Sequence, residues 1–227
     1  MTHFLSIDWA SDRPDLAIAF TQGHLKALRD FGVKGLHGAS DPASSFCRLA
    51  MITLHDQQGR ILGGIKLRVL GHDSTHSQYL TLAGKVSLAD GHPAPIEIGE
   101  LEGLWVHRNM RGQNLSKLIC QAALAFAGSL LLDRIILVSS GHMRPLLEEL
   151  GFRINIHQGH SGTIPYPSSH YISYFMDHET PIELAHLSAE NRKIILTLRQ
   201  CLKVSQRVEW KSMDGQYKPS GITLRPF

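Results

Sequence analysis

Apolar residues recur along the chain at spacings that predict an alternation of helices and strands. Asp12 and Pro14 suit a helix cap and a first turn, and apolar positions then follow helical spacing as far as residue 31. Residues 46–70 are typical of an antiparallel hairpin, because two β-prone stretches flank a turn of sequence Asp-Gln-Gln-Gly. We therefore expect a helix over much of 14–31 and then a half-buried pair of strands.

The most regular pattern lies between residues 96 and 157. The expected elements are, in order, a strand at 98–106, a polar turn at 107–114, a helix from Leu115, a strand at 134–139, a helix at 143–150 and a strand at 152–157. The first of these helices has apolar residues at i, i+3, i+4, i+7, i+8 and i+11, which is one helical face. Such an order predicts an α/β domain whose central strands are joined by crossover helices.

Residues 71–95 and the C-terminal segment have a different character. Residues 71–95 are rich in His, Asp, Gly, Ser and Pro and show little periodicity, so we expect a long connection, which would suit a position over a binding site. Residues 181–227 contain 8 Lys and Arg against 4 Asp and Glu, whereas residues 1–180 contain 15 against 16. We therefore divide the chain into a domain at 1–180 and a basic helix and tail at 181–227.

One helix is expected in this tail, with Ser188 as its N-cap. The apolar face of that helix comprises Ile194, Ile195, Leu198, Cys201 and Leu202. Such a face must cover an apolar surface, either on the chain's own domain or on a second subunit of a homodimer. The sequence leaves both arrangements open.

Composition narrows the class of protein. Apolar residues make up 43% of the chain and charged residues 19%, which is ordinary for a globular protein and excludes disorder along the whole length. No apolar stretch is long enough to cross a membrane, and the N-terminus lacks the pattern of a secretory leader, so we expect a cytoplasmic protein. The three cysteines suit no disulfide framework, and the 14 histidines have no supporting cluster of cysteines or carboxylates. No metal is therefore expected.

The turn at 107–114 is a candidate anion site. A glycine-containing turn between a strand and a helix gathers unpaired backbone N–H groups at the positive end of the helix dipole. Gly112 permits close approach of a ligand, the amides of residues 113–116 are the first without an intrahelical partner, and Arg108 and Arg111 add positive charge. An ordinary β-to-α connection would use the same glycine, so the turn alone does not distinguish the two.

Three stretches together contain the motifs of one enzyme family. Residues 100–116 are Glu-Leu-Glu-Gly-Leu-Trp-Val-His-Arg-Asn-Met-Arg-Gly-Gln-Asn-Leu-Ser, residues 143–152 are Met-Arg-Pro-Leu-Leu-Glu-Glu-Leu-Gly-Phe, and the hairpin contains Gly63-Gly64. The combination resembles the GNAT superfamily of acyl-CoA-dependent N-acyltransferases, over roughly residues 10–178. The resemblance implies a mixed, mostly antiparallel central sheet flanked by helices, followed here by a helical tail.

The resemblance also implies acetyl-CoA or another acyl-CoA as co-substrate. The residues it places at the cofactor are Leu104, Val106, Arg111, Gly112, Gln113, Asn114, Leu115 and Ser116. The family's loop has Gln or Arg, then Gly, then Gly or Ala at the positions of Asn109, Gly112 and Asn114, so the first and third depart from the pattern. The chain also has Leu147 where many members have a tyrosine acid, and Ser140 where an asparagine is frequent.

The implied reaction is direct attack by an amine on the thioester, between the fourth and fifth strands. A lysine-like amine is only about 0.1% neutral at neutral pH, so a base is useful. Glu100 and Glu102 share one side of the strand by alternation, and either is a candidate base, directly or through water. Their alternative role is to face solvent or to bind a basic neighbour. His142, Tyr166 and Tyr171 are candidates for the acid that protonates the leaving thiolate, and the sequence does not choose among them.

Two other functions stay open. One is a synthase that takes acyl chains from acyl carrier protein, resembling N-acyl amino acid and acyl-homoserine lactone synthases; the long 71–95 segment and the basic tail would suit an acidic carrier protein. The other is a degenerate domain that binds a ligand without catalysis, which Asn114 and Leu147 would favour. The sequence names neither the acceptor amine nor the acyl chain length. Neither a membrane nor a nucleic acid is expected as a partner.

Overall fold

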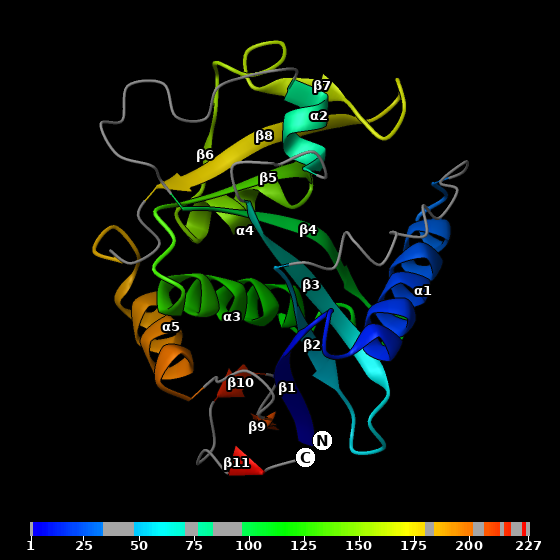
Figure 1. Cartoon of the computed structure of the whole chain (residues 1–227), viewed down its shortest axis with the longest axis vertical. Coiled ribbons are helices and arrows are strands. Elements are labelled where there is room, and N and C mark those ends of the chain that lie inside the picture. Colours follow the sequence, from blue (N-terminus) through cyan, green and yellow to red (C-terminus); the bar gives the residue numbers. More distant parts are fainter. Residues whose placement is uncertain are drawn as a thin grey trace.

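A central sheet with helices on both of its faces forms the body of the molecule (Figure 1). The computed structural model describes residues 2–33, 48–70, 77–83, 97–179, 184–201, 207–213, 216–218 and 224–225. Its elements are, in chain order, β1 (Thr2–Trp9), α1 (Pro14–Asp30), β2 (Leu49–His55), β3 (Ile61–Leu70), α2 (Gln78–Ala83), β4 (Ile98–Val106), the 3-10 turn η2 (Arg108–Met110), α3 (Leu115–Ser129), β5 (Arg134–Ser140), α4 (Arg144–Glu149), β6 (Arg153–Ile154), β7 (Thr163–Pro165), β8 (Ile172–Glu179), α5 (Ala189–Cys201), β9 (Arg207–Met213), β10 (Gln216–Lys218) and β11 (Leu224–Arg225).

The described strands form one sheet in the order β10-β9-β1-β2-β3-β4-β5-β8-β6, with β11 beside β9 and β7 beside β8. Neighbouring strands are antiparallel except for β4 and β5, which run parallel. That parallel pair requires a crossover, which α3 provides between the two strands. The predicted mixed, mostly antiparallel sheet flanked by helices is therefore confirmed.

Helices α1 and α3 cover opposite faces of this sheet (Figure 1). Alternate residues of β2 pack against each of them: Ile52 and Leu54 belong to the same core as Ile119 of α3, whereas Met51 packs with Phe20 of α1. Every residue of β2 is buried as a result. The expectation of a half-buried hairpin is wrong, because a helix covers each face of the pair.

The helix expected over much of 14–31 is α1, and Pro14 is its first residue. Asp12 is not the N-cap of α1, because Arg13 occupies that position. No side chain at the N-cap bonds to the first N–H groups of the helix. Arg13 instead bonds to Asp15 at 2.9 Å. Asp15 places a carboxylate in the first turn, where the helix dipole favours negative charge.

Two elements have no counterpart in the sequence pattern. β1 precedes the first expected helix and pairs with both β2 and β9, so it is an interior strand. α2 lies inside 71–95, for which the sequence predicts an irregular connection, and the residues of that segment outside 77–83 lie beyond the described part of the chain. A helix of 6 residues is too short to show amphipathic periodicity. The strand expected at 152–157 is shorter than predicted, because β6 has only 2 residues.

The tail helix α5 packs on its own domain. Ser188 caps it as predicted, since its Oγ accepts a hydrogen bond from the N–H of Asn191 at 3.2 Å. Ile195 and Leu198 are buried in the same core as α3. The Oδ1 of Asn191 also accepts a hydrogen bond from Gln121 of α3 at 3.0 Å, which satisfies two buried amide side chains. The apolar face of α5 is therefore covered within one chain.

After α5 the chain returns to the sheet, and β9 pairs with β1 over Thr2 to Ser6. Leu202, the last residue of the expected apolar face, lies outside the described residues. The division into 1–180 and 181–227 stays a prediction. A homodimer contact through the tail also stays a prediction.

We expect Leu198→Ala to destabilise the protein by about 2–5 kcal/mol, the usual cost of the cavity left by a buried leucine. Leu196→Ala is the matched control on the same helix and should cost less than about 0.5 kcal/mol, because Leu196 is 43% exposed and Leu198 only 1%. Urea unfolding at several protein concentrations measures both changes. A wild-type midpoint that rises with protein concentration would instead place this helix in a subunit interface.

Candidate active site

β4 and β5 separate partway along their length. They pair in register as far as Leu101 and Leu137, where their ladder stops. β4 continues to Val106 beside β3, and β5 continues to Ser140 beside β8. In the described part of the chain no strand lies between the separated ends. The sheet is therefore divided at its centre, at the carboxyl ends of its one parallel pair.

A bulge turns β4 where it leaves β5. The register with β3 shifts between Glu102 and Trp105, and Gly103 has a φ of +67°. Residues with a side chain rarely adopt this backbone conformation, so a glycine suits the position. Trp105 packs against Phe20 of α1, whereas Val106 faces the core beneath α3. The bulge therefore re-aims the side chains that follow it.

Glu100 lies beside the point of separation and is buried, at 1% exposed. Its Oε1 accepts a hydrogen bond from the backbone N–H of Tyr79 in α2 at 2.7 Å, and its Oε2 has no hydrogen-bond partner among the described residues. Burial, and then the negative charge of Glu102, raise the pKa of Glu100 to about 7. A carboxylate with this pKa exchanges its proton at neutral pH, as a general base must.

Glu102 lies two residues further along the same strand and has a different environment. Its Oε1 is 2.9 Å from Nη2 of Arg68, and the two side chains are 13% and 7% exposed. The guanidinium offsets the charge of Glu102 in a poorly solvated site. Of the two carboxylates, Glu100 alone combines burial with an oxygen that has no hydrogen-bond partner among the described residues.

Tyr166 is the candidate acid that meets these carboxylates. Its pKa is raised, first by burial and then by the negative charge of Glu102, and its side chain bonds to Gln78 of α2. Tyr171 is exposed, and its backbone carbonyl accepts the N–H of Tyr166 at 2.8 Å. The structure therefore places Tyr166 within electrostatic reach of Glu102 and beside α2, the helix that also bonds to Glu100, and it leaves the Tyr171 side chain at the surface.

His142 and Leu147 lie in other surroundings. The Nδ1 of His142 is 3.0 Å from Oγ of Ser140, and its ring centroid is 6.1 Å from that of Phe31 at the end of α1. Leu147 is buried in the core beneath α3. The position where many family members have a tyrosine therefore contributes packing in this chain and no proton.

Helix α2, which the sequence did not predict, borders the carboxylates. Tyr79 is fully buried, with its ring centroid 5.0 Å from that of Phe175, and its hydroxyl oxygen accepts a hydrogen bond from Asn155 at 3.3 Å. The Oγ of Ser77 accepts the N–H of Leu80 at 3.0 Å and caps the helix. No local sequence pattern predicts the site around Tyr79, because its partners Glu100, Asn155 and Phe175 are distant in the chain.

His24 of α1 was also missed and lies against the bulge. A Cβ added to Gly103 would be 3.4 Å from its Nδ1. Burial lowers the pKa of His24 to about 4, and the positive charge of Lys66 acts in the same direction. The imidazole is therefore neutral at pH 7. Its position on α1 is ordinary in sequence, so only the tertiary contact identifies it.

The turn at 107–114 leads into α3 with an open backbone. Gly112 has a φ of +79°, and a Cβ added there would meet nothing within 4 Å. Asn114 precedes the helix in the left-handed conformation, at φ +57°, and makes no side-chain cap. Asparagine tolerates this conformation better than most residues, so the departure from the family's small residue fits the turn. The first N–H groups of α3 lack a capping side chain, as an anion site requires.

The other residues expected at the cofactor differ in how exposed their side chains are. Val106 and Leu115 are buried in the core, and Leu104 packs against it, so a ligand would meet mainly their backbone. Gln113 and Ser116 are half-buried at the start of the helix. Among these residues the turn therefore offers backbone groups more than side chains.

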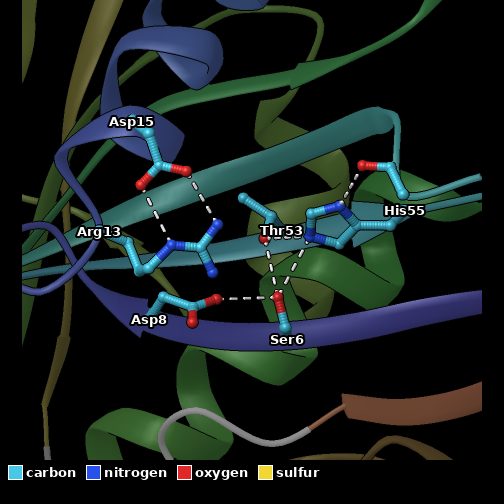
Figure 2. Close-up of polar contacts among 7 residues, drawn as sticks. Ser6, Asp8, Arg13, Asp15, Thr53 and His55 are labelled. Carbon is cyan, nitrogen blue, oxygen red and sulfur yellow. Dashed lines mark hydrogen bonds and ion pairs between the residues drawn. The ribbon is translucent and has the colours of Figure 1, made fainter. Parts of the chain in front are cut away.

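A second polar cluster joins β1 to β2 (Figure 2). Ser6 Oγ donates to Asp8 Oδ2 at 3.0 Å and lies 3.2 Å from Nε2 of His55, which Thr53 Oγ1 also contacts at 2.8 Å. All four side chains are buried. In a Ser-His-Asp triad the histidine lies between the other two, whereas here Ser6 bonds to both. The cluster therefore satisfies buried polar groups between two strands and lacks the arrangement of a nucleophilic site.

Among the residues that the structure describes, no three His, Cys, Asp or Glu side chains gather as metal ligands would. Within the same residues, no helix has the length and apolar character needed to cross a membrane.

The described residues thus form a divided sheet, with a buried carboxylate beside the division and an open glycine turn before α3. Residues 19–152 match the acetyltransferase (GNAT) family, which is more than half of the chain. The chain therefore belongs to the GNAT acetyltransferase family. No curated protein sequence matches it.

Solved structures of this fold are similar to the chain at low sequence identity. The CoA-dependent acyl-homoserine lactone synthase BjaI has a TM-score of 0.56 and 12% identity, over 87% of this chain and 90% of its own. The N-acyl amino acid synthase FeeM from uncultured soil microbes has a TM-score of 0.58 and 11% identity, over 78% and 95%. ElaA of Escherichia coli has a TM-score of 0.55 and 11% identity, over 77% and 98%. At these identities the likeness shows the fold alone.

The raised pKa of Glu100 predicts that stability depends on pH. The folded chain binds this proton more tightly than the unfolded chain, where a glutamate titrates near about 4.3, so stability should fall as pH rises from there to about 7. Over that pH interval the free energy of unfolding of wild type should fall by about 2–4 kcal/mol relative to that of Glu100→Gln. Urea unfolding of both proteins between about pH 4 and 8 measures the difference. A difference that does not change with pH would contradict the assigned pKa.

Proposed function

We propose that the protein transfers an acetyl or other short acyl group from acyl-CoA to a primary amine by direct attack. The observation that supports this most is Glu100, a buried carboxylate with a pKa of about 7 beside the separation of β4 and β5. Family membership supports acyl-CoA as the donor. We place the reaction in the cytoplasm, which the composition favours.

In the proposed step, the lone pair of the neutral amine attacks the carbonyl carbon of the thioester, and a C–N bond forms. The tetrahedral intermediate collapses as the C–S bond breaks, and sulfur leaves with its electron pair as the CoA thiolate. Glu100 takes the proton that the amine loses, directly or through water. Tyr166 gives a proton to the thiolate and regains one from solvent, a role supported by its place beside Glu102.

The pyrophosphate of the cofactor is proposed to bind at the turn before α3. Gly112 leaves open space there, the first amides of α3 face an incoming anion, and Arg111 adds positive charge. The acyl arm would then run between the separated ends of β4 and β5 toward Glu100. This path uses the backbone of Leu104 and Val106, because the Val106 side chain is buried in the core and the Leu104 side chain packs against it.

Gly112→Glu should abolish binding of acetyl-CoA, because it adds both bulk and a like charge where the pyrophosphate would lie. Gly59→Glu is the matched control: Gly59 has a φ of +78°, close to the +79° of Gly112, and it too has nothing within 4 Å of an added Cβ, but it lies in the hairpin turn. Both substitutions therefore introduce similar backbone strain, and only Gly112→Glu should weaken binding of the ligand. Isothermal titration calorimetry with acetyl-CoA measures both. Unchanged affinity in folded Gly112→Glu protein would refute the cofactor site.

Glu100→Gln should lower kcat by about 10²- to 10⁴-fold at neutral pH, because the amide cannot accept the amine proton. Wild-type activity should rise as pH increases through about 7, where Glu100 loses its proton, and the loss in the variant should shrink as the amine deprotonates unaided. Glu97→Gln is the control, since the Glu97 side chain is 54% exposed just before β4. Full activity in both Glu100→Gln and Glu102→Gln would place the base elsewhere.

The choice of donor separates this proposal from the two alternatives. Acyl transfer from acetyl-CoA to a panel of amines supports the proposed enzyme. Turnover with acyl carrier protein alone would indicate a synthase of the kind that the long 71–95 segment and the basic tail suggested. Binding of acetyl-CoA without turnover on any amine would indicate a non-catalytic domain, as Asn114 and Leu147 allowed.

A further inference from the structure

Phe31, the residue that follows α1, contacts side chains from both sides of the divided sheet. The guanidinium carbon of Arg111 lies 4.1 Å from its ring centroid. The centroid of the His142 ring lies 6.1 Å from that of Phe31, with the two rings tilted by 31°. Phe31 is nevertheless 54% exposed, so these contacts do not bury it in the core.

The two partners of Phe31 come from opposite sides of the separation. Arg111 belongs to the turn that follows β4, one residue before Gly112, and His142 belongs to the turn that follows β5. β4 and β5 no longer pair beyond Leu101 and Leu137. A single aromatic ring, from the residue that follows α1, therefore contacts side chains in the turns that follow both separated strands.

An aromatic ring and a carboxylate hold an arginine side chain in different ways. In an ion pair the carboxylate offsets the charge of the guanidinium, as Glu102 does for Arg68 and Glu148 does for Arg144. A ring face attracts the cation and occupies none of its N–H donors. No carboxylate among the described residues forms an ion pair with Arg111, so its charge and its donors remain available to an anion beside the α3 amides.

We propose that Phe31 positions Arg111 and His142 as the two sides of a clamp for the pyrophosphate of acyl-CoA. The inference rests on the proposed function and adds two residues to that site: Phe31 acts as a positioning residue, and His142 binds the cofactor and does not protonate the thiolate. The Nδ1 of His142 is 3.0 Å from Oγ of Ser140, which fixes the orientation of its ring.

The first test is titration of CoA into wild type and three variants. Phe31→Ala should weaken CoA binding by about tenfold, which corresponds to about 1.4 kcal/mol. Phe31→Tyr keeps the ring and should stay within about twofold of wild type. Ile18→Ala is the matched control, because Ile18 lies on α1, the helix that Phe31 follows, and is 56% exposed. Equal affinity for wild type and Phe31→Ala would overturn the inference.

A second measurement separates positioning from a general structural effect. If Phe31 acts through Arg111 and His142, adding Phe31→Ala to the double variant Arg111→Ala/His142→Ala should weaken CoA binding no further, within about twofold. Turnover of acetyl-pantetheine, a thioester without pyrophosphate, should be the same in wild type and Phe31→Ala. A further loss of CoA affinity in the triple variant, or a slower reaction of Phe31→Ala with acetyl-pantetheine, would overturn the clamp.

The outcome also shows which proposal has failed. A wild-type protein that binds no CoA overturns the proposed function, and the clamp with it. A wild-type protein that binds and turns over acetyl-CoA, with a Phe31→Ala variant that behaves identically, leaves the proposed function intact and overturns the clamp alone. His142→Ala provides the matching check on the other side of the clamp, since it should weaken CoA binding as Phe31→Ala does; unchanged CoA affinity in folded His142→Ala protein would overturn the clamp.

Discussion

The separation of β4 from β5 is the constraint on which the rest of the site depends. Beyond Leu101 and Leu137 each strand keeps only its outer neighbour, β3 for one and β8 for the other. Both outer ladders are antiparallel and continue to Val106 and Ser140, so the separated ends are supported without each other. Their inner backbone groups have no ladder partner in the described part of the chain, and buried backbone groups need partners. Under the proposed function, the amide groups of a bound acyl-CoA arm would supply them.

The two faces of the sheet differ in what they contribute to the candidate site. The face beneath α3 is an apolar core, and it includes Leu147 at the position where a family acid is frequent. The face beneath α1 and α2 holds Glu100, the ion pair of Glu102 with Arg68, and the neutral His24. Burying an ionised Glu100 lowers stability above its pKa, and the same carboxylate fixes α2 through the N–H of Tyr79. The residue that costs stability therefore also builds the site.

Local pattern predicted the elements that have long, regular periodicity, and it failed where structure depends on distant contacts. β4, the glycine turn and α3 follow the sequence because one helical face and one turn define them. β1 and α2 do not, since an interior strand at the N-terminus and a helix of 6 residues depend on their neighbours. Alternation predicts that Glu100 and Glu102 share one side of the strand, but nothing local predicts that Glu102 forms an ion pair with Arg68 whereas Glu100 accepts the N–H of Tyr79. The sequence makes His142 a candidate acid, yet its ring contacts Phe31 and Ser140 rather than the carboxylates.

The absence of a tyrosine at Leu147 changes where the leaving thiolate can obtain its proton under the proposed mechanism. With Leu147 in the core beneath α3, α4 offers no acid there, and the candidate beside the carboxylates is Tyr166, from the segment between β7 and β8. Tyr166 bonds to Gln78, and Glu100 bonds to the N–H of the next residue along α2. The proposed acid and base thus meet consecutive residues of one short helix. The reaction needs both groups, since the amine must lose a proton and the thiolate must gain one. Because both bond to α2, a displacement of α2 would move the proposed acid and base together.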